Sequence, residues 1–127
     1  MVRCGSHVKD VLLVEDNTLT LILLESQFVK HGLSVVKAMD GAAGLEACQS
    51  QHFDLLIIDI NIPVFSGKQL IEKLKLNHSQ TKGKKIAISS GLSKSDVNEL
   101  LKLGFDACLN KPIHIKKDEE GIYIEGN

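Results

Sequence analysis

The chain has 127 residues, of which 43% are hydrophobic, and this is enough for one domain with a packed core. Its 15 Lys and Arg residues nearly balance its 16 Asp and Glu residues, which argues against a surface built for direct binding of nucleic acid. No apolar stretch approaches the roughly 20 residues of a membrane span, so no membrane insertion is expected. The three scattered cysteines match no zinc or disulfide pattern and indicate a reducing, cytoplasmic location.

Short apolar runs alternate along the chain with segments that carry helical spacing or helix start signals. The runs lie at residues 11–14, 33–36, 55–58 and 86–88, with a weaker one at 107–109. Runs that are apolar without alternation suit strands covered on both faces, as the strands of a parallel sheet are. The sequence therefore predicts an α/β fold in which helices flank a five-stranded parallel sheet.

Four helices are predicted between these strands. Asp40 is the expected cap of the second, at residues 41–51, and serines open the next two, Ser66 with a Gln three residues later and Ser93. Gly104 falls where a left-handed terminator of the fourth helix is expected. The residues predicted to face the sheet are Leu21, Leu24 and Phe28 in the first helix, Leu70, Ile71 and Leu74 in the third, and Val97, Leu100 and Leu101 in the fourth.

Residues 8–112 make up the predicted domain, and the segments at either side differ from it. Residues 113–127 form an atypical C-terminal tail without an apolar stripe, so the helix that should close a fifth βα unit is predicted to be absent or abnormal. Residues 1–7 are interpreted as an N-terminal extension that includes a Gly-Ser-His piece of the kind left by cloning. A missing helix exposes apolar surface beside the first helix, and one hypothesis is a homodimer through the altered C-terminal region.

Reactive side chains follow the ends of four of the predicted strands. They are Glu15 and Asp16 after the first strand, Asp59 after the third, Ser89 after the fourth and Lys111 after the fifth. In an open parallel sheet, ligands bind beyond the carboxyl ends of the strands. These five side chains are therefore expected to meet in one cleft.

Three carboxylates in one cleft repel one another, and a divalent cation is the simplest compensation. Mg²⁺ prefers hard oxygen ligands and leaves positions open for phosphate oxygens. Asp16 is the expected direct ligand, Glu15 binds directly or through water, and the backbone carbonyl of Asn61 adds another oxygen. Asp59 is then both a ligand and a nucleophile, because carboxylates form aspartyl-phosphate intermediates.

The remaining two side chains suit the charge of a transferring phosphoryl group, which is spread over three oxygens. The Ser89 hydroxyl can donate to one of these oxygens and the Lys111 ammonium can pair with another. Ser90 competes with Ser89 for this role, but the alternation of side chains along a strand and the spacing back from Lys111 favour Ser89.

Four motifs at the strand ends carry a resemblance to a known family. They are LLVEDN at 12–17, IDINIP at 58–63 with Gly67 beyond it, IAIS at 86–89 and NKP at 110–112. In this order they resemble the receiver domains of response regulators and hybrid histidine kinases, the CheY-like superfamily, over about residues 8–112.

The resemblance implies a doubly wound sheet of strand order 2-1-3-4-5, Mg²⁺ dependence and a phosphoryl group accepted on Asp59. The donor it implies is a histidine kinase or a histidine phosphotransfer protein, and phosphorylation then switches partner interactions. Such a module catalyses only its own phosphorylation and dephosphorylation and has no separate substrate. A cis bond before Pro112 is also expected.

The sequence departs from the family pattern in three places. Cys108 stands where many members have a Tyr or Phe whose rotation reports phosphorylation, so this aromatic switch is absent. Residues 62–66 lack the usual methionines and acidic residue, which we interpret as tolerated variation. Ser90 stands where the family often has a small alanine, and Gly91 just beyond it leaves the phosphoryl group open to water, which predicts a short-lived or readily transferred phosphoryl group.

Three other functions are alternatives to a phosphorylated receiver. One is a receiver-like interaction domain that is not phosphorylated, which the absent aromatic and the unusual tail would suit. A phosphohydrolase of the haloacid dehalogenase type needs a second acid two residues after its nucleophile, where this chain has Asn61. Flavin binding needs a Ser/Thr/Gly-rich phosphate loop after the first strand, and the sequence has none there.

Overall fold

The computed structural model describes residues 1–76 and 82–126 and places them in two sheets and four helices. In chain order the elements are β1 (Val2–Gly5), β2 (Asp10–Val14), α1 (Thr18–Lys30), β3 (Ser34–Ala38), α2 (Gly41–Ser50), β4 (Leu55–Asp59), α3 (Gly67–Leu76), β5 (Lys84–Ser89), α4 (Lys94–Leu103), β6 (Ala107–Asn110), β7 (His114–Asp118) and β8 (Gly121–Glu125). Within the described ranges, no helix has the length and apolar character needed to cross a membrane.

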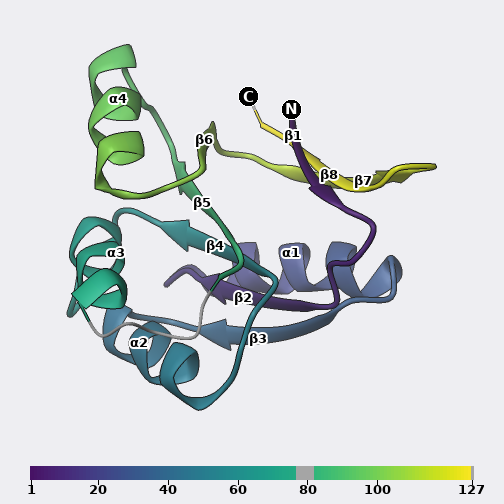
Figure 1. Ribbon diagram of the computed structural model, residues 1–127, viewed down its shortest axis with the longest axis horizontal. Coiled ribbons are helices and arrows are strands. Elements are labelled where there is room, and N and C mark those ends of the chain that lie inside the picture. The colour runs from purple at the N-terminus through teal and green to yellow at the C-terminus, as the bar shows by residue number, and fades with distance from the viewer. Residues whose placement is uncertain (77–81, 127) are drawn as a thin grey trace.

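The larger sheet has five parallel strands in the order β3-β2-β4-β5-β6 (Figure 1). These are the five strands expected from the sequence, so the order is the 2-1-3-4-5 that the resemblance implies. The α/β fold and its doubly wound sheet are therefore confirmed.

Both faces of the larger sheet are covered, which explains why its central strands are apolar without alternation. Along β4, Leu55 and Ile57 pack into a core with α1, whereas Leu56 and Ile58 pack into a second core with α2, α3 and α4. All four side chains are excluded from solvent. Burial on both faces stabilises β4 strongly and fixes the position of Asp59 at its end.

The predicted helix boundaries are largely confirmed by their caps. The Asp40 side chain accepts from the backbone of Ala43, and Ser93 forms a capping box with an aspartate at the third helical position. Gly104 ends α4 with a φ of 123°, a conformation that only glycine adopts without strain. One prediction was wrong: Leu101 is 43% exposed, because the buried stripe of α4 is narrow and passes through Leu100.

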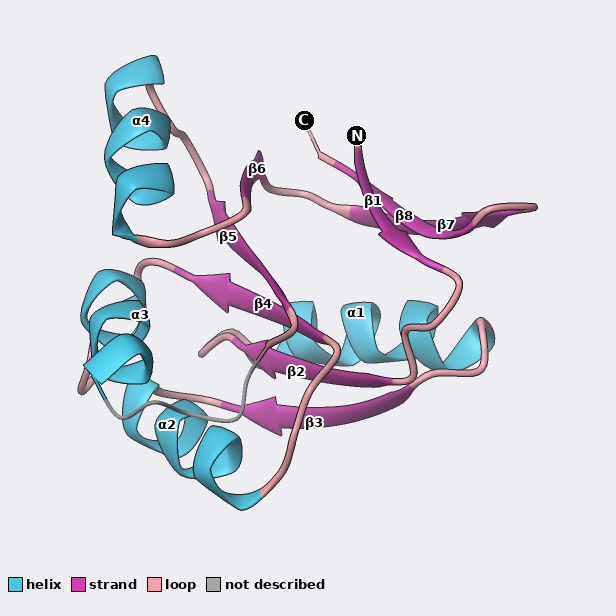
Figure 2. Ribbon diagram, in the orientation of Figure 1, coloured by secondary structure: helices cyan, strands magenta, loops and turns pink. Residues whose placement is uncertain are grey.

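The fifth helix is absent from the described residues, as predicted, and a second sheet lies in its place against α1 (Figure 2). This second sheet, defined as strands β1, β8 and β7 in that order, is antiparallel and was not predicted. Its buried isoleucines, together with Ile113 directly before β7, share a core with the inner face of α1; the three in the sheet are Ile115, Ile122 and Ile124. Since the chain covers this face of α1 itself, the original reason for expecting a homodimer no longer applies.

Side chains from the rest of the domain cover both edges of the second sheet. The amide of Ile115 in β7 donates to Gln27 Oε1 of α1 at 2.8 Å, and Lys84 Nζ donates to the carbonyl of Arg3 in β1 at 2.5 Å. Arg3 also forms an ion pair with Asp118 at 2.7 Å. Capped edges resist pairing with other chains. The N-terminal segment is thus part of the fold: β1 pairs with β8 on one side and accepts a hydrogen bond from Lys84 on the other.

Asp54 joins the start of β4 to the start of β2, at the end of the sheet opposite Asp59. Its Oδ2 accepts from the amides of Lys9 and Asp10 at 2.9 and 3.0 Å, and His52 lies 3.3 Å from Oδ1. The backbone hydrogen bond from Asp10 is the largest cause that lowers the pKa of Asp54; burial opposes it, while Lys9 and His52 reinforce it.

Replacing Asp54 by asparagine should lower the free energy of unfolding by about 1 kcal/mol at pH 7, because hydrogen bonds to a charged acceptor are lost. The folded pKa lies below the unfolded value, so the wild-type stabilisation is full above pH 4 or so and is lost as pH falls through the folded pKa. Urea unfolding of both proteins between pH 7 and pH 3 measures this. A constant difference over that range would contradict the role of the carboxylate charge.

Candidate functional site

The structure brings the predicted acidic residues together at the carboxyl ends of β2 and β4. Glu15 and Asp59 are 1% and 4% exposed, whereas Asp16 is open to solvent. One carboxylate oxygen from each of the three lies within 4.8 Å of the others, a spacing that a single metal ion can bridge. This arrangement follows from the parallel register, in which the ends of β2 and β4 are adjacent.

Lys111 reaches into this cluster from the segment after β6. Its Nζ donates to Glu15 Oε1 at 2.5 Å and to Asp59 Oδ2 at 2.6 Å. Burial acts to lower the pKa of Lys111, but the two carboxylates outweigh burial and raise it, so the ammonium stays charged. The other oxygen of Asp59 accepts from the amide of Asn61 at 2.9 Å.

Negative charge in the cluster is not fully compensated by Lys111. Burial, and then the hydrogen bond and charge of Asp59, raise the pKa of Glu15 to about 7, although Lys111 acts in the opposite direction. Three carboxylates with one ammonium leave an excess of negative charge among oxygen ligands. This donor set fits a small hard cation such as Mg²⁺, as the sequence predicted.

Ser89 ends β5 next to this cluster. Its side chain is buried, whereas Ser90 is exposed, so the two serines predicted as alternatives occupy different environments. The loop that follows is held by Asn110, whose Oδ1 accepts from the amide of Leu92 at 2.9 Å. No role was assigned to Asn110 from the sequence. Its position directly before Lys111 was the one feature that could have indicated a role at the site.

The loop after Asp59 turns back tightly on β4. The amide of Gly67 donates to the carbonyl of Ile60 at 3.1 Å and closes the loop. A Cβ at position 67 would lie 2.6 Å from the Ile60 Cα and 2.9 Å from the Asp59 carbonyl oxygen. Only glycine allows this approach, so Gly67 fixes the backbone beside the candidate nucleophile.

Val64 in the same loop has a φ of 68°, a conformation that strains a β-branched residue. Its side chain is 67% exposed, so little burial offsets the strain. We expect Val64→Asn to raise the free energy of unfolding by about 1 kcal/mol, since asparagine tolerates left-handed backbone. Urea unfolding tests this, with Val64→Thr as the β-branched control. Equal stability of the Asn and Thr variants would contradict the explanation.

Cys108 lies in β6 and is half-buried against the core formed with α2, α3 and α4. Burial raises the pKa of its thiol. The position that holds an aromatic side chain in many receivers therefore holds a small apolar group here.

Comparisons with known proteins agree with the fold. The family described as response regulator receiver domain matches residues 11–120, a range that extends past Pro112 into the second sheet. The sensor histidine kinase GacS of Pseudomonas protegens is 32% identical over 112 residues, which are 86% of this chain and 12% of GacS. The chain thus spans about an eighth of that relative.

Solved structures show the same architecture. A CheY-like receiver domain protein from Methanospirillum hungatei aligns with a TM-score of 0.73 and 30% identity, over 83% of this chain and 82% of that one. The receiver domain of Ssk1 from Saccharomyces cerevisiae, solved with the histidine phosphotransfer protein Ypd1, aligns with a TM-score of 0.75 and 26% identity, over 85% and 80% of the chains. The chain therefore belongs to the response regulator receiver domains of two-component systems.

Proposed function

We propose that this receiver accepts a phosphoryl group from a phosphohistidine donor on Asp59 and that phosphorylation changes its partner interactions. The observation that carries the proposal is the environment of Asp59, a buried carboxylate that contacts Lys111 and Asn61 and lies within 4.8 Å of oxygens of Glu15 and Asp16. A carboxylate used only as a helix cap or a turn residue needs no such set of charged neighbours.

In the proposed transfer, an Asp59 oxygen attacks phosphorus. A P–O bond forms, the P–N bond to the donor imidazole breaks, and the imidazole leaves with the electron pair and takes up a proton. Lys111 can pair with one phosphoryl oxygen and the Ser89 hydroxyl can donate to another, which spreads the developing charge. Ser89 and Lys111 are held for this by adjacent strands, since the Lys111 amide donates to the Ser89 carbonyl at 2.8 Å.

Asp16, Glu15, Asp59 and the carbonyl of Asn61 are the groups proposed to hold Mg²⁺. The excess of carboxylates and the raised pKa of Glu15 support a cation at this position. When bound, Mg²⁺ would neutralise charge on the carboxylates and on the phosphoryl oxygens.

The proposed donors are a histidine kinase or a histidine phosphotransfer protein. The pairing of Ssk1 with Ypd1 and the match to a sensor histidine kinase support this class of partner. A cytoplasmic location is part of the proposal, because such donors exchange phosphoryl groups with soluble receivers. No separate substrate is proposed, and Asn61, where an aspartyl-phosphate hydrolase needs an acid, argues against that alternative.

Incubation with acetyl phosphate and Mg²⁺, followed by intact mass measurement, tests the proposal. The wild type should gain one phosphoryl group, and Asp59→Asn or a chelator should prevent the gain. Asp54→Asn is the matched control because Asp54 lies directly before the start of β4, at the end opposite Asp59, so this variant should still be phosphorylated. An unmodified wild type would instead support the unphosphorylated interaction domain.

A further inference from the structure

A short link joins the candidate phosphoacceptor site to the second sheet. Lys111 contacts Asp59, and β7 begins at His114, so only Pro112 and Ile113 lie between the site and the sheet. The two ends of the link are fixed differently. The Lys111 amide is bound to the carbonyl of Ser89, whereas the Ile113 side chain is buried against α1.

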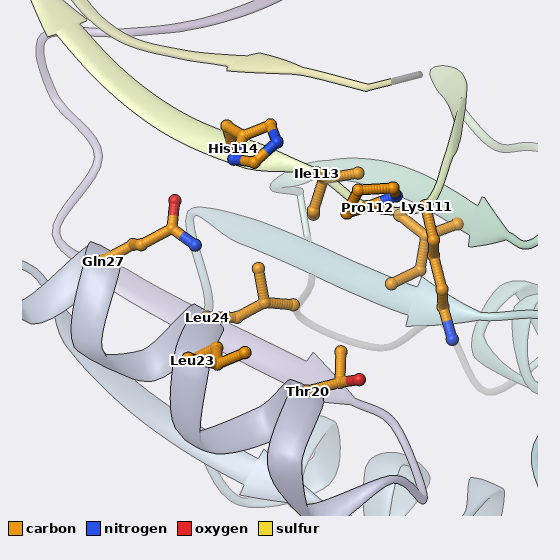
Figure 3. Close-up of a pocket in the computed structure, with 9 residues that line it drawn as sticks. Thr20, Leu23, Leu24, Gln27, Lys111, Pro112, Ile113 and His114 are labelled. Atoms are coloured by element: carbon orange, nitrogen blue, oxygen red, sulfur yellow. The ribbon is translucent and has the colours of Figure 1, made fainter.

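Unfilled space lies on one side of this link. A cavity of about 360 Å³ lies beside the link and is lined by residues 111–114 on one side and by α1 on the other (Figure 3). Its remaining lining residues are Thr20, Leu23, Leu24, Gln27 and Ile88. Packed cores resist displacement, because a shift on one side needs space on the other. The cavity supplies that space, so residues 111–114 can move toward α1 while the strands of the larger sheet keep their positions.

Phosphorylation of Asp59 changes the partners of Lys111. The carboxylate that accepts from Nζ becomes an acyl phosphate, whose added oxygens carry most of the charge. The strongest acceptor for Lys111 Nζ is then a phosphoryl oxygen, which lies farther from the end of β4 than the Asp59 oxygen that Nζ contacts here. The other acceptor, Glu15, is unchanged. Because Lys111 is itself the first residue of the link, we expect a change in its ion pairs to shift the backbone of residues 111–114.

We propose that phosphorylation moves the link of residues 111–114 into the α1 cavity and thereby shifts the second sheet, an inference that rests on the proposed function. Three features favour this route. The sheet stands where a fifth helix is expected, and β7 is tied to α1 through the Gln27 bond to Ile115. In addition, position 108 holds a cysteine, so the rotating aromatic side chain that reports phosphorylation in many receivers is absent here.

The chain provides its own reporter for this movement. Tyr123 is the only tyrosine and there is no tryptophan, so tyrosine emission comes from β8 alone. The guanidinium of Arg3 in β1 lies 5.3 Å from the centre of the Tyr123 ring. Lys84 of β5 donates to the backbone carbonyl of Arg3 and so ties β1 to the larger sheet. Movement of β7 and β8 with the link therefore changes the position of the Tyr123 ring relative to the Arg3 guanidinium, and with it the emission.

The experiment adds beryllofluoride and Mg²⁺ to the full chain and follows two signals. Fluorine NMR reports whether an adduct forms on Asp59, and Tyr123 emission together with amide exchange of residues 114–125 reports on the second sheet. We expect both signals to change in the wild type and neither in Asp59→Asn. An adduct without any change in the sheet overturns this inference and leaves the proposed function intact. No adduct in the wild type overturns the proposed function itself.

A matched pair of α1 variants tests the cavity. Leu23→Phe enlarges a side chain that lines the cavity, whereas Ile22→Phe enlarges its neighbour, which is similarly exposed but is not among the lining residues. We expect both variants to form the adduct, with the Tyr123 response lost in Leu23→Phe and kept in Ile22→Phe. A full response in Leu23→Phe contradicts movement into the cavity.

Discussion

Replacing Lys111 by methionine should tighten Mg²⁺ binding while it slows phosphoryl transfer. Lys111 Nζ lies at 2.5 and 2.6 Å from two of the carboxylates proposed to hold the cation, so the ammonium competes with Mg²⁺ for the same oxygens. Even at an effective dielectric constant of 20, charges a few ångströms apart interact by several kcal/mol. Removing one positive charge should therefore raise the affinity for Mg²⁺ about tenfold or more.

The same substitution removes a donor to the phosphoryl group. Loss of one preorganised donor of this kind typically slows a reaction about 100-fold. Methionine keeps most of the length and apolar volume of the lysine stem that lines the α1 cavity. Calorimetric titration with Mg²⁺ and the rate of phosphorylation by acetyl phosphate measure the two effects. Weaker Mg²⁺ binding in Lys111→Met would contradict the proposed sharing of ligands.

Truncating Ile124 to alanine should destabilise the whole domain by about 2–5 kcal/mol. Ile124 is completely buried in the second sheet and packs into the core that contains Leu24 and Phe28 of α1. The loss combines apolar burial with the cost of a cavity, so Ile124→Val should cost only about 1 kcal/mol. Urea unfolding measures both. An Ala variant as stable as the wild type would show that the second sheet does not complete the core.

Deletion of residues 1–5 separates the contribution of β1 to stability from that of the hairpin formed by β7 and β8. The deletion removes the pairing of Val2 and Arg3 with β8 and the ion pair of Arg3 with Asp118, and it exposes the outer edge of β8. We expect lower stability and, because an uncovered edge can pair with another chain, greater self-association in sedimentation. A monomer with unchanged stability would identify residues 1–5 as a dispensable extension.

The larger sheet could be predicted because its strands are buried on both faces. This burial gives continuous apolar runs that differ clearly from the helical segments between them, as in residues 55–58. The site followed from the same pattern, since parallel strands bring Glu15, Asp59 and Ser89 to a single edge of the sheet. Local capping signals at Asp40, Ser66 and Ser93 then fixed three helix starts.

The second sheet could not be predicted by the same means. Its strands are short, and β7 buries only Ile115 among charged neighbours, so no segment carries a strong pattern alone. The pairing of Val2 with Ile124 joins the two ends of the chain, and such a contact leaves no local signal. At the site, the sequence placed Lys111 in one cleft with the carboxylates but did not predict which of them it contacts. The left-handed backbone of Val64 depends on tertiary packing and could not be predicted either.

The most direct test of the central claim is to locate the modified residue. After incubation with acetyl phosphate and Mg²⁺, reduction with borohydride converts an aspartyl phosphate to homoserine, and peptide mass spectrometry then identifies the position. We predict modification at Asp59 and at none of the other acidic residues, including the neighbouring Glu15 and Asp16. An unmodified Asp59, or a modification elsewhere, would contradict the assignment of Asp59 as the phosphoacceptor.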